Sequence, residues 1–263
     1  MILYRSAKSF AAARAIAADK IAGGADLRFV DADGAVAVEP ALAAIAPHIA
    51  GAVHAPGEEV GDPFRFCQGA AAALAAAGGD ICCRTAITRI EADGTRPAVV
   101  SGDGARLAAD RIILCAGVAS AGLARTIGVR LPILPMKGYS ITAPPGPAAP
   151  TVSVTDAANR VVFARLAGRM RIAGLADLGQ RDPAVDPARL AALIAGARAA
   201  LPDAADYGAA GPGWAGLRPM TPDSLPITCP IAPGVIANTG HGALGWTYAA
   251  GSAERVAALV AAC

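Results

Sequence analysis

The chain has 263 residues, which allows one large domain or two small ones. Its formal net charge is only +2, its Lys and Arg residues are scattered, and aromatic residues make up 4% of the chain. These values argue against a nucleic-acid-binding protein, which needs a basic surface or stacking aromatic side chains.

Alanine makes the composition apolar, but no membrane-spanning helix is expected. The longest uncharged run, residues 224–253, contains three prolines and several glycines that would break such a helix. The first residues lack the apolar core of a signal peptide, so we expect a cytoplasmic protein. The six cysteines form no Cys-x-x-Cys pair and have no neighbouring histidine, which predicts no metal site and buried, reduced thiols.

The first 80 residues read mainly as helices. A helix over 6–21 stops at two glycines, and Asp62 and Pro63 provide a cap and a first position for another helix that runs to Gly78. The segments between them are predicted as a strand over 26–30, a turn over 31–34 and a short helix from Glu39 to just before Pro47.

After residue 80 the pattern changes to short strands. A hairpin is predicted around 101–104, and the apolar run 111–115 is typical of the buried centre of a parallel sheet. The other predicted strands are 81–84, 86–91, 136–143, 151–154, 161–166, 170–174 and 235–239, and the predicted helices are 119–127, 186–201 and 243–261.

These patterns predict an α+β fold with two lobes. Strands and helices of parallel type, in 61–132 and 220–263, surround an antiparallel block within 133–219. The N-terminal segment 1–60 is grouped with that block. Because three prolines and a glycine break the chain after residue 143, residues 133–175 are expected to form an antiparallel sheet separate from the strand at 111–115.

Arg218 is the leading candidate for ligand binding. It lies in Gly216-Leu-Arg-Pro219, where the proline restricts the residue before it, so we expect a rigid turn. A guanidinium binds a carboxylate through two parallel hydrogen bonds. The alternative is an ordinary structural or surface ion pair, which is the role of most arginines.

A second motif follows about two dozen residues later, at Asn238-Thr-Gly-His-Gly-Ala-Leu-Gly245. Its three glycines let the backbone approach a flat ligand closely, and the helix that follows points its positive end at that ligand. An ordinary glycine-rich turn between strand and helix is the alternative.

With Trp214 and the Trp-Thr pair after Gly245, these motifs resemble the C-terminal part of the FAD-dependent D-amino-acid dehydrogenase and oxidase family, which includes glycine oxidase-like enzymes. The resemblance implies that Arg218 grips the substrate carboxylate while hydride passes from the α-carbon to flavin. It assigns 61–132 and 220–263 to a partial FAD-binding lobe, and 1–60 and 133–219 to a substrate lobe.

The resemblance also implies cofactor contacts. The proposed FAD-binding residues are Ile87, Gly117, Lys137, Gly138, Gly240, His241, Gly242, Ala243, Leu244 and Gly245. His241 is interpreted as a packing or flavin-contacting residue and not as a general base, because hydride transfer requires none. Tyr139 is a candidate catalytic residue, with a core strand position as its alternative.

One element of the family is missing from this sequence. The family's initial strand, Gly-x-Gly-x-x-Gly turn and helix, which would hold the ADP half of FAD, are not recognised in it; the glycine spacing alone occurs in the C-terminal part, at residues 211–216 and 240–245. Three readings follow: a truncated member that is defective in FAD binding, a subunit completed in trans by a separate nucleotide-binding chain, or a non-catalytic carboxylate-binding module.

The sequences of residues 137–142 and 238–242 resemble the bacterial dehydrogenase branch of the family more than the oxidase branch. The resemblance then implies a D-amino acid as substrate and a quinone or another electron acceptor at the membrane surface. It places the protein in the cytoplasm or peripherally at the inner face of the membrane.

Overall fold

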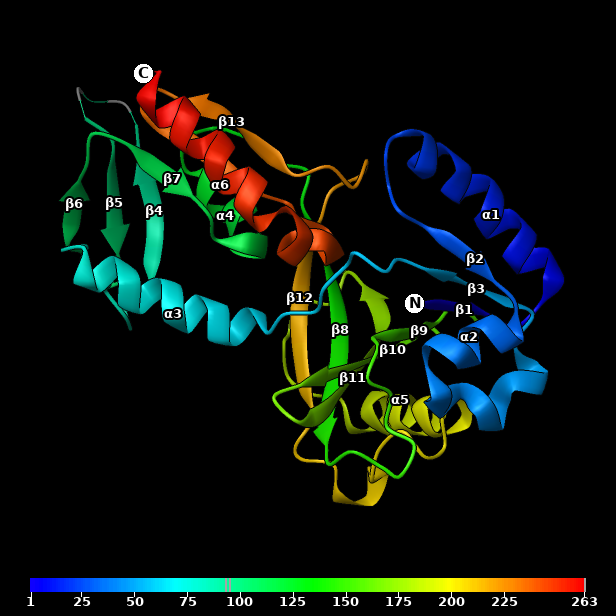
Figure 1. Cartoon of the computed structure of the whole chain (residues 1–263). Helices are drawn as coiled ribbons and strands as arrows, with labels where there is room; N and C mark the ends of the chain where they lie inside the picture. Colours follow the sequence, from blue (N-terminus) through cyan, green and yellow to red (C-terminus); the bar gives the residue numbers. More distant parts are fainter. Residues whose placement is uncertain (93, 95, 263) are drawn as a thin grey trace. The chain divides into compact units, whose positions relative to one another are not determined.

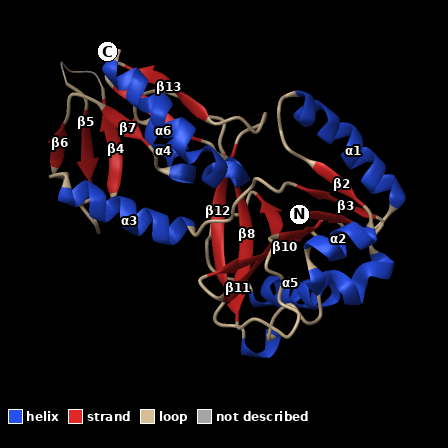
Figure 2. Ribbon diagram, viewed as in Figure 1, coloured by secondary structure: helices blue, strands red, loops and turns tan. Residues whose placement is uncertain are grey.

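The computed structural model describes residues 1–92, 94 and 96–262. They form two compact units, each assembled from segments that are distant in sequence (Figures 1 and 2). Unit 1 comprises Met1–Asp62, Gly138–Ala176 and Pro183–Gly216, and unit 2 comprises Pro63–Lys137, Asp177–Asp182 and Leu217–Cys263.

An eight-stranded sheet forms most of unit 1, with strand order β12-β8-β11-β10-β9-β1-β3-β2. Strands β9, β10 and β11 pair antiparallel, as do β1, β3 and β2, and the parallel pair β1–β9 joins the two sets. The strands are β1 Ile2–Tyr4, β2 Arg28–Val30, β3 Gly51–His54, β8 Leu134–Ala143, β9 Val154–Asp156, β10 Val161–Leu166, β11 Arg169–Leu178 and β12 Trp214–Met220.

Local capping explains where the helices of unit 1 begin. The side chains of Ser6, Asp31 and Asp186 each accept a hydrogen bond from a backbone N–H in the first turn of the following helix, which satisfies a donor that the helix leaves open. The helices are α1 Ala7–Ala22, α2 Ala32–Val38 and α5 Pro187–Ala200, with 3-10 segments η1 Pro40–His48 and η3 Tyr207–Ala209.

Helix α1 packs against β1 and β3 (Figure 1), and the aromatic ring of Phe10 lies at this contact. A Cβ atom added to Gly51 would lie 2.3 Å from Cε1 of Phe10, so the ring occupies the space that any other residue would need. Phe10 also contacts the rings of Tyr4 and Phe29. A glycine at the start of β3 therefore allows the alanine-rich helix to pack on the sheet.

A buried ion pair ties three parts of unit 1 together. Nη2 of Arg5 lies 2.6 Å from Oδ2 of Asp156, whose side chain is fully buried. The same nitrogen donates to the Ala200 carbonyl at the end of α5, and Oδ1 of Asp156 accepts from the backbone of Ala158 and Asn159. Burial alone raises the pKa of Asp156, but the hydrogen bonds from Asn159 and Arg5 outweigh it and hold the pKa below its usual value.

Unit 2 contains two three-stranded sheets, with orders β13-β14-β7 and β4-β5-β6. Strand β14 pairs antiparallel with β13 and parallel with β7, whereas β4, β5 and β6 are antiparallel throughout. The strands are β4 Ile87–Glu91, β5 Ala98–Ser101, β6 Arg106–Ala108, β7 Ile112–Leu114, β13 Ile227–Ala232 and β14 Val235–Thr239.

The helices of unit 2 differ in how they pack. Helix α6 contacts β13 and β14, and α4 contacts β4, whereas α3 buries none of its residues (Figure 1). They are α3 Pro63–Ala76, α4 Ser120–Arg125 and α6 Gly245–Ala261, with 3-10 segments η2 Gly117–Ala119 and η4 Gly242–Leu244. The core of unit 2 is correspondingly small and centres on Ile90, Ile112, Leu114, Ala124 and Val235.

The expected α+β fold and the separate antiparallel sheet are confirmed. Strands β8, β9, β10 and β11 belong to the large sheet, whereas β7 lies in another. The chain passes from one unit to the other after residues 62, 137, 176, 182 and 216. The expected boundaries were 60, 132 and 219, and assigning the units to FAD and substrate stays a prediction.

Several local predictions were wrong. Residues 81–84 do not form a strand: Cys83 and Arg84 lie in a turn, with Arg84 at a φ of 58°. The expected turn at 31–34 is the first turn of α2. Within the described residues, β7 is an edge of its sheet and not its centre. Strands β1, β3, β12 and β13 were not predicted, because they are short or contain glycine and proline.

The cysteines also differ from expectation. Cys67, Cys82, Cys83, Cys115 and Cys229 are free and exposed, not buried, and Cys263 lies outside the described residues. Among the described residues, no helix is long and apolar enough to cross a membrane. No group of three His, Cys, Asp or Glu side chains in this described part is arranged to bind a metal ion.

Replacing Asp156 with asparagine should destabilise the protein by about 3 kcal/mol at neutral pH, because Arg5 is left without its charged partner. The folded pKa is depressed, so the carboxylate stabilises the fold above its unfolded pKa and ceases to do so as pH falls through the folded value. Urea unfolding at pH 7 and pH 3 should therefore show a difference that shrinks in acid.

Asp26→Asn is the matched control, because Asp26 pairs with Arg28 while both side chains are largely exposed. It should change stability by less than about 0.5 kcal/mol. Equal effects of the two substitutions would contradict the role given to the buried pair.

Candidate functional site

Two glycine-containing turns follow neighbouring parallel strands in unit 2. Ala237 of β14 pairs with Leu114 of β7, and both strands run in the same direction. Gly117 follows β7, and Gly240 follows β14. The carboxyl ends of parallel strands lie at one edge of a sheet, which is where ligands bind in open α/β folds.

A hydrogen bond joins the two turns directly. Oγ1 of Thr239, a buried side chain, donates to the carbonyl oxygen of Gly117 at 3.1 Å. Gly117 has a φ of +56°, and a Cβ atom built there would have no other atom within 4 Å. The space over this turn is therefore open, which leaves room for a ligand against its backbone.

The second turn packs against the end of β12. Gly240 has a φ of +78°, and a Cβ on it would lie 2.7 Å from Cγ2 of Thr221. Gly242 has a φ of +55°, and its Cβ would lie 2.9 Å from Sδ of Met220. Both conformations are rare for L-residues, so the packing and the backbone each require glycine at these positions.

Arg218 lies on this same strand, two residues before Met220. It is part of β12 itself, so the expected rigid turn is wrong, and Pro219 is accommodated within the strand. The side chain is half-buried, and burial lowers the pKa of the guanidinium. A cation that is partly removed from water interacts more strongly with a bound anion than an exposed one does.

His241 is held by the helix that follows the turn. Nε2 of His241 lies 2.8 Å from Oγ of Ser252, which is buried on α6. Burial lowers the pKa of the imidazole, so it is neutral at neutral pH. These contacts favour the packing role expected for His241 over that of a general base.

The remaining candidate residues are spread over both units. Ala243 and Leu244 belong to η4, and Gly245 begins α6. Ile87 begins β4, in the other sheet of unit 2. Lys137 is buried on β8 in unit 2, whereas Gly138, the next residue, belongs to unit 1. Their proposed contacts with a cofactor stay predictions.

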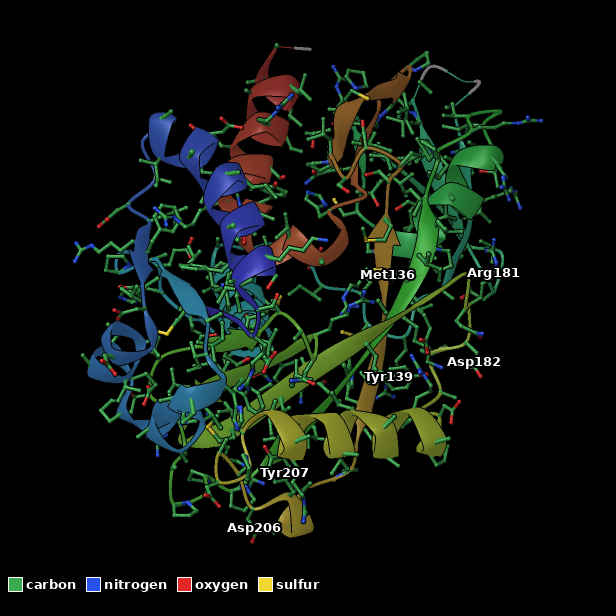
Figure 3. The ribbon with its side chains drawn as sticks, turned by 90° about the vertical axis from the view of Figure 1, so that its right-hand side faces the viewer. Met136, Tyr139, Arg181, Asp182, Asp206 and Tyr207 are labelled. Atoms are coloured by element: carbon green, nitrogen blue, oxygen red, sulfur yellow. The ribbon has the colours of Figure 1, made fainter. Side chains whose placement is uncertain are left out.

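Tyr139 lies in the core of unit 1. Its side chain is 2% exposed and belongs to the same apolar cluster as Ile141 and Ala143 of β8. Figure 3 shows it on the large sheet, and Tyr207 beside α5. This burial favours the core interpretation over a catalytic role, because a catalytic side chain must reach the substrate.

Sequence reasoning missed the residues that shape the turns. They are Met220, Thr221, Thr239 and Ser252, which pack against or hydrogen-bond to the residues that were predicted. Only Thr221 carried a local signal, since Thr-Pro-Asp-Ser is a turn sequence, and its Oγ1 indeed donates to the Leu225 carbonyl.

Comparison with known proteins identifies the family. Residues 1–259 match the family model described as "DAO: FAD dependent oxidoreductase". The chain belongs to this family of FAD-dependent oxidoreductases. The resemblance seen in the Arg218 and glycine motifs is thereby confirmed.

Curated relatives share about 40% of the aligned residues. A D-amino acid dehydrogenase from Paramagnetospirillum magneticum is 42% identical over 228 residues, which cover 85% of this chain and 54% of that protein. One from Cereibacter sphaeroides is 39% identical over 263 residues, covering 98% and 60%. The chain thus spans between half and two thirds of the length of these relatives.

Solved structures show the same fold. Glycine oxidase from Geobacillus kaustophilus superposes with a TM-score of 0.87 at 24% identity, covering 98% of this chain and 69% of that one. The L-α-glycerophosphate oxidase of Mycoplasma pneumoniae, with FAD bound, gives a TM-score of 0.85 at 17% identity, covering 97% and 71%.

The turn at Gly117 leaves space for a flat ligand. Gly117 offers open backbone, whereas the side chains of Thr221 and Met220 occupy the space beside Gly240 and Gly242. Oγ of Ser120, at the start of α4 and fully buried, has no hydrogen-bond partner among the described residues. An unsatisfied buried hydroxyl next to Gly117 is consistent with a polar ligand at this edge.

Gly240→Ala should destabilise the protein by at least about 1–2 kcal/mol, because alanine is strained at a φ of +78°. Contact with Cγ2 of Thr221 adds to this cost. Gly251→Ala is the control, since this glycine lies in α6 with open space around it, and the change should stabilise by about 0.5–1 kcal/mol. Urea unfolding monitored by circular dichroism measures both, and equal signs would contradict the analysis.

Proposed function

We propose that this chain carries the substrate- and flavin-contacting part of an FAD-dependent D-amino acid dehydrogenase, which deaminates D-amino acids oxidatively. One observation carries the proposal. In this member of the family, the strand that contains Arg218 ends at Met220, and the side chains of Met220 and Thr221 pack against the glycine turn at 240–242. The dehydrogenase names of relatives at about 40% identity support the reaction and the D-configuration of the substrate.

FAD, when bound, would supply the acceptor for a hydride from the α-carbon of the amino acid. The residues of this chain bind and orient. Arg218 receives the substrate carboxylate with its planar fork, which fixes the α-carbon in place. The backbone N–H groups at the start of η4 and α6 offer partial positive charge to an electron-rich ring edge.

Proton transfer by His241 is not part of this proposal. Its imidazole is neutral and engaged with Ser252, and its role is to hold the turn against α6. We infer that electrons leave to a quinone or a similar acceptor at the membrane surface, in keeping with the dehydrogenase names of the relatives.

Tight FAD binding, we propose further, requires a nucleotide-binding segment in addition to these residues, on the same or another polypeptide. Helix α3 buries no residue, and Phe64 on it is 70% exposed. Strand β7 is an edge of a parallel pair, although parallel strands are normally covered on both sides. The longer relatives contain additional residues that could form such a nucleotide-binding segment.

Removing the guanidinium tests the proposed reaction. In FAD-loaded protein with D-alanine as substrate, Arg218→Ala should lower kcat/KM by about 2–5 kcal/mol, expressed as transition-state stabilisation. Arg218→Lys should recover only part, because an ammonium cannot form the two-pronged contact. Arg130→Ala, an exposed arginine of the same unit, is the control and should behave as wild type.

Near-normal kinetics of Arg218→Ala would contradict the assignment. If FAD-loaded protein turns over no D-amino acid, yet still binds D-alanine through Arg218, the chain is instead a carboxylate-binding module. Calorimetric titration with D-alanine distinguishes these results, because it detects binding without turnover.

Cofactor titration tests the need for a further segment. The 263-residue chain alone should bind FAD weakly, because the strand, glycine turn and helix that would hold the ADP half of FAD are not recognised in its sequence. Quenching of flavin fluorescence measures the affinity. Tight, stoichiometric binding by this polypeptide alone would overturn the requirement.

A further inference from the structure

A second arginine in unit 1 is arranged to bind an anion. Arg171 lies on β11, on the face of the sheet opposite the core: its neighbours Met170 and Ile172 are fully buried, and Gly174 faces Leu193 of α5. Strand alternation therefore places the Arg171 side chain on the side away from α5. That side chain is only half-buried.

Two contacts fix the orientation of the guanidinium. Nη1 of Arg171 donates to Oγ1 of Thr142 on β8 at 2.9 Å. Its Cζ atom lies 5.7 Å from the centre of the Trp214 ring on β12. Because the strand order is β12-β8-β11, the Arg171 side chain extends across β8 toward β12. Its guanidinium contacts Thr142 on the first of these strands and Trp214 on the second.

Arg171 has N–H donors beyond the one that Thr142 accepts. A guanidinium has five N–H donors, and the contact with Thr142 uses one of them. Burial lowers the pKa of the Arg171 guanidinium, and the negative charge of Asp62 acts in the opposite direction. A partly desolvated fork without an anion is costly unless a ligand supplies one.

Ser140 provides an independent observation on the same face. It alternates with Ile141 and Ala143, which belong to the core, and so shares the face of Thr142. Its Oγ atom is buried and has no hydrogen-bond partner among the described residues, while the whole residue is 3% exposed. Buried hydroxyls are almost always paired, so the polar part of this face is incomplete.

We propose that Arg171, Thr142 and Trp214 form a binding site for a small organic carboxylate, separate from Arg218. The carboxylate takes the free edge of the guanidinium, and the indole of Trp214, 57% exposed, covers the apolar part of the ligand. This inference goes beyond the proposed function, which places the substrate carboxylate on Arg218. It does not depend on FAD.

Tryptophan fluorescence provides a local readout. The chain has two tryptophans, and Trp246→Phe leaves Trp214 as the only one while keeping an aromatic ring beside Phe66. In this background, butyrate should change the Trp214 emission in a saturable way. Butyramide, which has the same shape without charge, and chloride at equal ionic strength should not.

Variants of the site should follow the contacts. Arg171→Gln should weaken butyrate binding by about ten-fold or more, and Arg171→Lys should restore only part of it. Thr142→Val keeps the guanidinium but removes the oxygen that orients it, and should weaken binding several-fold. Arg165→Gln is the matched control, an exposed arginine on the neighbouring strand β10 that should leave binding unchanged.

The outcomes separate this site from the proposed function. Arg218→Ala should leave the Trp214 response intact, whatever it does to amino acid oxidation. An equal response to butyramide or chloride, or an unchanged response in folded Arg171→Gln or Arg171→Lys protein, overturns the proposal. Circular dichroism of each variant verifies folding, and if Arg171→Gln is unfolded, Thr142→Val decides.

Discussion

The parallel pairing of β14 with β7 is the constraint on which the candidate site depends. It brings the ends of two strands, separated by more than a hundred residues of sequence, to one sheet edge. Each strand is then followed by a turn with a left-handed glycine, and Thr239 bonds one turn to the other. Without this pairing, Gly117 and Gly240 would be two unrelated glycine turns, and no flat ligand could contact both.

Elements with strong local signals were predictable from the sequence. Asp186 and Pro187 mark the start of α5, and the ends of β10 and β14 coincide with the predicted ones, because capping and alternation are properties of neighbouring residues. The same reasoning failed for β1 and β3, which are stable only as partners in the large sheet. It failed at Asp31 because an aspartate caps a helix as readily as it forms a turn.

The candidate site divides in the same way. Arg218 and the glycines were recognisable as a motif, since their roles follow from residue type and spacing. Met220, Thr221 and Thr239 were not, because each matters through an atom distant in sequence or across a turn: a sulfur against Gly242, a methyl against Gly240, a hydroxyl on Gly117. Tyr139 shows the converse, since it directly follows Lys137 and Gly138, two proposed cofactor contacts, yet belongs to the core of unit 1.

The two units differ in how far they satisfy themselves. Unit 1 has a continuous core beneath its sheet and buried polar side chains, Glu39 and Asp156, whose oxygens are hydrogen-bonded. Unit 2 has a small core, an apolar helix with no buried residue and, among its described residues, five exposed cysteines. Apolar surface of this kind lowers stability unless something covers it. A layer that covers α3 and β7 would therefore stabilise unit 2. Because binding and folding are linked, the same layer would also strengthen the binding of any ligand whose site needs the folded turns.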